Sequence, residues 1–60
     1  MNGQSVRLER ALERLRYWSK TLDEARKAGK VGEAVAAKQR VGEYTLLVAD
    51  LREQGAEPLR

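Results

Sequence analysis

The chain contains no cysteine, no histidine and no phenylalanine, and only one proline, among its 60 residues. Without thiols and imidazoles, it has no disulfide, no Cys/His zinc site, no thiolate nucleophile and no imidazole acid or base. Its serines and threonines therefore lack a histidine base, and its carboxylates show no spacing typical of a metal site. We expect a protein that is not an enzyme and carries no cofactor.

Long hydrophobic runs are also absent. No apolar stretch approaches the about 20 residues that a membrane-spanning helix needs. Residues 6–10 alternate apolar and charged side chains, whereas a signal peptide has an uninterrupted apolar segment near its start. These absences indicate a soluble, cytoplasmic protein that does not contact a membrane.

Apolar residues recur at spacings of three and four in two segments, which is the pattern of helices that pack together. The first segment has Leu8, Ala11, Leu15, Trp18, Leu22 and Ala25 at these positions. The second segment has Ala34, Ala37, Val41, Tyr44, Val48 and Leu51. The two sets, called the seam below, predict a helix over 6–28, with Ser5 as its N-cap, and a helix over 32–54.

Glycines mark the ends of both periodic segments. Gly29 and Gly32 predict a turn over 29–32, while Gly55 and Pro58 end the second helix and leave a short tail over 55–60. Two helices of about 22 residues joined by so short a turn must lie antiparallel. The sequence therefore predicts an all-α fold, a single helical hairpin with Trp18 on its seam.

A chain of this length supplies only a small core, so association with another chain is an expected source of stability. The second helix carries further apolar or small residues on a different face: Val31, Val35, Gly42, Leu46 and Ala49, called the apolar stripe below. The first helix cannot cover both faces. We predict that the apolar stripe is a partner interface and that two hairpins form a coiled-coil-like four-helix bundle. The alternative is that these are scattered surface residues.

Basic residues are concentrated in the first half of the chain. Residues 1–30 carry eight Lys and Arg and four Asp and Glu, whereas residues 31–60 carry four and five. Four residues of the first helix fall on one face beside the seam: Arg7, Arg10, Arg14 and Tyr17, called the arginine stripe below. Such a face is suited to phosphates, with the tyrosine available for base stacking. A solvated face with ion pairs such as Arg10–Glu13 and Asp23–Lys27 is the favoured interpretation.

These patterns predict a small non-enzymatic interaction or regulatory protein that acts as a helical-hairpin oligomer, with a homodimer as its first expected state. One alternative is a regulator that binds RNA or DNA through the arginine stripe. Another is an accessory subunit of a larger protein complex that buries the apolar stripe against a different chain.

Overall fold

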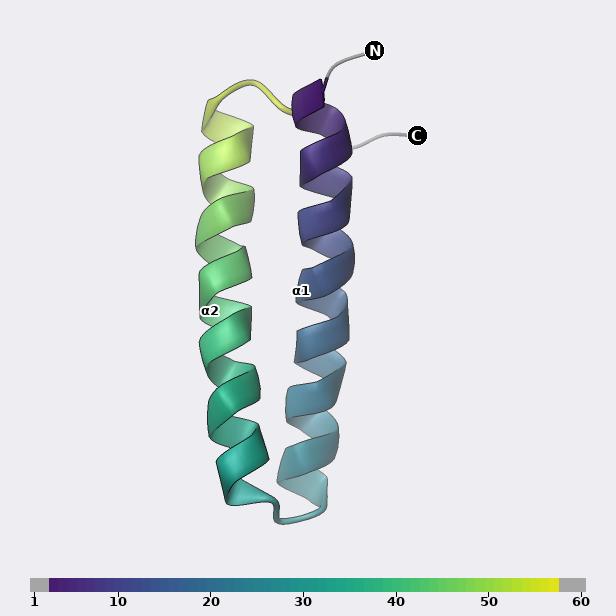
Figure 1. Cartoon of the computed structure of the whole chain (residues 1–60), viewed down its shortest axis with the longest axis vertical. Helices are drawn as coiled ribbons and strands as arrows, with labels where there is room; N and C mark the ends of the chain where they lie inside the picture. The colour runs from purple at the N-terminus through teal and green to yellow at the C-terminus, as the bar shows by residue number, and fades with distance from the viewer. Residues whose placement is uncertain (1–2, 58–60) are drawn as a thin grey trace.

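The structure, a computed structural model, describes residues 3–57. Two α-helices, α1 (Gly3–Lys27) and α2 (Val31–Glu53), lie side by side and antiparallel (Figure 1). This arrangement confirms the predicted all-helical hairpin. The Cα atoms extend over 42 × 19 × 10 Å, so the molecule is two helices wide and one helix thick.

Both helices end in the same way, at a glycine in the left-handed region. Gly29 has φ 71° and Gly55 has φ 93°. The Gly29 N–H donates to the Arg26 carbonyl (3.2 Å), and the Lys30 N–H donates to the Ala25 carbonyl (2.9 Å). The same pair of bonds recurs at the end of α2, from Gly55 to Arg52 and from Ala56 to Leu51, each 3.0 Å. These are Schellman motifs, which satisfy the last helical carbonyls and reverse the chain direction.

The helix starts differ slightly from the sequence-based expectation. α1 begins at Gly3 instead of residue 6, so Ser5 lies inside the first turn, where it is buried and is not the N-cap. The Gln4 Nε2 donates to Gln54 Oε1 (2.9 Å), which ties this added turn to the end of α2. α2 begins at Val31, directly after Lys30, which makes no side-chain capping bond. Residues 58–60 of the predicted tail lie outside the described part.

The core is concentrated at the end of the hairpin away from the connection. One cluster joins five buried residues there: Leu8, Ala11, Val48, Leu51 and Ala56, with Leu12, Leu15 and Tyr44 packed against it. Leu8 of α1 thus shares one cluster with Val48 and Leu51 from the last turns of α2. Toward the connection, only Ala25 and Ala37 are buried. The seam therefore buries large side chains at the end away from the connection and only small ones near the connection.

Within residues 3–57, neither helix has the length and hydropathy needed to cross a membrane.

Candidate functional site

The apolar stripe is exposed along the whole of α2. Val31 and Leu46 are each 74% exposed and Val35 is 59% exposed, and Gly42 and Ala49 are also in the exposed class. A Cβ atom built on Gly42 meets nothing within 4 Å. The stripe therefore has no partner within the hairpin, as expected from its position away from the seam.

An apolar groove begins where the stripe approaches α1, next to the connection. Its volume is about 310 Å³, and it is lined by Leu22, Ala25, Arg26, Gly29, Lys30, Val31, Ala34, Val35 and Lys38. The floor is aliphatic, while Arg26, Lys30 and Lys38 place cationic groups at its rim. The end of the seam near the connection and the apolar stripe thus line the same groove on one side of the molecule.

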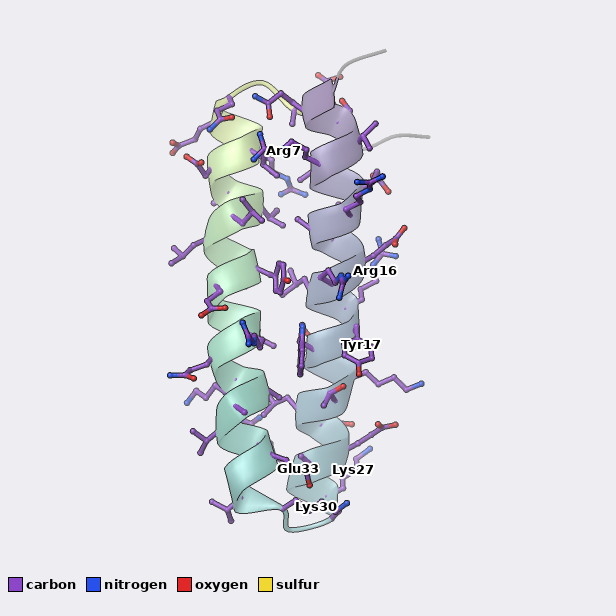
Figure 2. The ribbon with its side chains drawn as sticks, in the orientation of Figure 1. Arg7, Arg16, Tyr17, Lys27, Lys30 and Glu33 are labelled. Carbon is purple, nitrogen blue, oxygen red and sulfur yellow. The ribbon has the colours of Figure 1, made fainter. Side chains whose placement is uncertain are left out.

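The arginine stripe lies on the opposite broad side of the hairpin. Arg7, Arg10, Arg14 and Tyr17 are all exposed. In Figure 2, Arg7 lies between the two ribbons at the end away from the connection, whereas Lys27, Lys30 and Glu33 gather near the connection. Helix α1 therefore holds the three arginines in one row, and Tyr17 continues this row toward the connection.

The second helix adds residues that the sequence pattern alone did not assign to this side. A groove called the arginine groove below, of about 190 Å³, is lined by Arg7, Arg10, Ala11, Arg14, Tyr44, Leu47 and Leu51. Below it, Arg40 of α2 places its Cζ 5.9 Å from the centre of the Trp18 ring. The sequence does show that Arg40 shares a helix face with Tyr44, four residues later. It does not show which residues of α1 lie beside Arg40, because that depends on how the two helices align.

Trp18 is half-buried, as expected for a seam residue that exposes one edge. Its ring meets Tyr17 edge-on, with ring centres 5.1 Å apart and planes at 83°. Arg40 and Tyr17 thus flank the indole from two helices. A row of cationic and aromatic groups results, formed by Arg40, Trp18 and Tyr17.

The ion pairs of the described residues include none of the three arginines of the arginine stripe, although one of them involves Arg40 beside Trp18. Lys27 pairs with Asp23 (3.0 Å), Lys30 with Glu33 (3.6 Å), and Arg40 with Glu43 (3.2 Å). The predicted Asp23–Lys27 pair is confirmed. The predicted pairing of Arg10 with Glu13 is not seen within residues 3–57.

The Lys27 ammonium has a raised pKa because it donates a hydrogen bond to the Asp23 carboxylate and lies in the field of its negative charge. Both side chains are largely exposed, 76% and 62%, so water screens the attraction. This pair supports the last turn of α1 and forms no reactive site.

Within residues 3–57, no group of acidic side chains is placed to hold a metal ion. The candidate sites are therefore the two surfaces on opposite sides of the hairpin. Comparison of the chain with protein-family models, with curated proteins and with solved structures gave no match.

Proposed function

We propose that the protein is a non-enzymatic interaction protein whose working form is a homodimer, in which two hairpins pair along their apolar stripes into a four-helix bundle. The observation that carries this proposal is the exposure of Val31, Val35 and Leu46 on one side of α2. Contiguous exposed apolar surface on a small protein is typical of an interface.

The small core supports association. Within residues 3–57, seven apolar residues are buried, of which four are alanines, and only Leu8 and Leu51 are large side chains removed fully from water. Because the hydrophobic contribution grows with the apolar area buried, alanines contribute little of it. Covering Val31, Val35 and Leu46 with a second hairpin would increase the buried apolar area that stabilises the fold.

The shape of the surface favours a helical partner. Leu15 and Leu22 of α1 belong to the seam and are half-buried, and the apolar groove joins Leu22 to the stripe. Gly42 leaves open space at the middle of α2. The Thr45 hydroxyl donates to the Val41 carbonyl (2.7 Å), so it needs no partner from another chain.

The charges favour a second copy as that partner. Arg26, Lys30 and Lys38 surround the connection end of the surface. At the other end of α2, Asp50 and Glu53 are exposed and outnumber the one cation there, Arg52. When two copies pair about a two-fold axis with their hairpins antiparallel, the cationic end of each meets the acidic end of the other.

The test compares two neighbouring substitutions on α2 by sedimentation equilibrium. Val35→Asp places a charge on the stripe, whereas Ala36→Asp places the same charge one residue later on another exposed face. We expect a dimer mass for the unmodified chain and for Ala36→Asp, and at least a tenfold weaker association for Val35→Asp, about 1.4 kcal/mol.

The melting temperature supplies a second readout. The melting temperature of a dimer rises with protein concentration, because association stabilises only the folded form. We expect this rise for the unmodified chain and its loss in Val35→Asp. A monomer mass at high micromolar concentration, with concentration-independent melting, would contradict the homodimer and favour the alternative of an accessory subunit that needs a larger protein.

A further inference from the structure

The three arginines of the arginine groove have no carboxylate partner within residues 3–57. The ion pairs of that region involve Lys27, Lys30 and Arg40, and Arg7, Arg10 and Arg14 are in none of them. A guanidinium offers a planar fork of N–H donors that matches a phosphate or carboxylate. These three side chains are therefore free to bind an external anion.

The spacing of the arginines suits an anionic chain better than a single small anion. Arg7 and Arg14 are two helical turns apart, a rise of about 10.5 Å along α1. A strand within a duplex advances about 3.4 Å per nucleotide, so this rise spans about three of its steps, and a more extended single strand covers it in fewer steps. Arg40 places a further guanidinium on α2, beside Trp18, where it is shared with the carboxylate of Glu43 (3.2 Å). A ligand with regularly repeated phosphates can contact several of these groups at once.

Aromatic groups beside the arginines favour unpaired bases. Tyr17 is 59% exposed, with its ring against Trp18, and Tyr44 lines the arginine groove from α2. Unstacked bases bind to such rings, whereas the bases of a duplex are stacked on one another and cannot reach them. We propose that the arginine groove, together with Arg40 and Tyr17, is a binding site for single-stranded nucleic acid.

Acidic residues set the boundary of this site. A second hollow on the same side, closer to the connection, is lined by Thr21, Glu24, Ala25, Ala28, Lys30 and Glu33. Glu24 and Glu33 repel phosphates, so the strand is expected to stop before the connection. The predicted site is therefore short, and it is separate from the apolar stripe on the other side of the hairpin.

The test measures fluorescence anisotropy of a fluorescein-labelled twelve-nucleotide oligothymidylate and of its oligouridylate counterpart over a range of salt concentrations. The site variant replaces Arg7, Arg10 and Arg14 by Gln. The control variant replaces Arg16, Lys20 and Arg52 by Gln, which removes three positive charges from exposed positions that line neither groove.

We expect at least a tenfold loss of affinity in the site variant near 150 mM salt. The log–log slope of affinity against salt should fall by about 2, since each phosphate contact on a single strand contributes about 0.7. The control variant should retain most of the affinity and most of the salt slope. Equal losses in the two variants, or no salt-sensitive binding by the unmodified chain, would overturn the proposal.

A second pair of variants tests whether both helices take part. Arg40→Gln removes the cation above Trp18, whereas Lys20→Gln removes a charge from an exposed position that lines neither groove. The chain has a single tryptophan, so its emission reports binding at this surface. Binding should perturb Trp18 emission, and Arg40→Gln should weaken affinity severalfold while Lys20→Gln should not.

Two competitors identify the ligand class. Unlabelled oligothymidylate should displace the probe at lower phosphate concentration than a duplex of the same length. Polyglutamate, which carries charge without bases, should compete weakly. If polyglutamate or the duplex competes as well as the single strand, the site recognises charge alone or a different macromolecule, and the proposal is wrong. Sedimentation equilibrium measures assembly and anisotropy measures strand binding, so failure of dimerisation and failure of binding are distinguished by separate readouts.

Discussion

At the residue scale, the glycines of this chain have opposite conformational roles. Gly29 occupies the left-handed region at φ 71°, where the Schellman bonds that end α1 require it. Gly42 lies inside α2 with ordinary helical geometry and open space around its Cα. A side chain is therefore strained at Gly29, whereas at Gly42 it removes the entropic disadvantage of glycine in a helix.

The first prediction follows from this difference. Gly29→Ala should lower the free energy of unfolding by about 1–2 kcal/mol, because alanine is disfavoured in the left-handed region. Gly42→Ala should raise it by up to about 1 kcal/mol, because alanine is the better helix former. Urea unfolding followed by circular dichroism, with dilute protein so that association contributes little, measures both. Changes of the same sign would contradict the assigned roles.

The Lys27–Asp23 pair carries a pH dependence of known sign. The pKa of Lys27 is raised in the folded protein by its hydrogen bond to Asp23, so the pair stabilises the fold below the ordinary lysine pKa of 10.5. That stabilisation disappears as the pH rises through the folded-state pKa. NMR titration of the Lys27 side chain should give a midpoint above 10.5 that returns toward 10.5 in Asp23→Asn.

At the element scale, the two ends of the helix pair differ in packing. Leu8 of α1 and Leu51 of α2 are 0% and 1% exposed, and they meet in the main cluster with Val48 and Ala56. Near the connection, Leu22 is half-buried and borders the apolar groove. The helices are therefore held together chiefly at the end where α1 starts and α2 stops.

A truncation series tests this asymmetry. Leu51→Ala should lower the free energy of unfolding by about 2–5 kcal/mol, because it leaves a cavity among fully buried neighbours. Leu22→Ala should cost clearly less, since its side chain is already partly in water. Chemical unfolding at one protein concentration compares them, and an equal or larger loss for Leu22→Ala would show that the connection end is the true core.

The helical hairpin was predictable from the sequence because its signals are local. Apolar residues at spacings of three and four, and the glycines at 29 and 55, determine the elements and where they stop. The start of α1 was not predictable from Ser5, because its first turn depends on the Gln4–Gln54 hydrogen bond between distant parts of the chain. Local capping signals carry no information about such contacts.

The candidate surfaces were predictable in part: the sequence identifies their members on each helix but not how residues of the two helices meet. The apolar stripe and the arginine stripe each lie on one helix, so helical periodicity identifies their members. The placement of Arg40 beside Trp18, and of Tyr44 opposite Arg10, depends on the alignment of α1 with α2. That alignment is set by the packing of Leu8 against Leu51 and Val48 at the far end. Periodicity within one helix cannot supply it.

At the scale of the whole molecule, the two surfaces lie on opposite sides of a body whose Cα atoms span 10 Å in its thinnest direction. α2 contributes Leu47 and Tyr44 to one side and Val31 and Val35 to the other. No second layer of structure separates the sides. A rotation of α2 about its own axis therefore changes both at once.

Because the hairpin is only one helix thick, the proposed dimerisation and the proposed strand binding are open to thermodynamic linkage. If the proposed strand turns α2 when it binds, it also changes the surface that a second hairpin would meet, and the two proposed equilibria would then share one free energy of coupling. Whatever factor assembly imposes on the affinity for a single strand, the strand must impose the same factor on assembly. In a thicker domain, an intervening layer can absorb such a rotation, whereas residues 3–57 of this chain form two helices with no layer between the two surfaces.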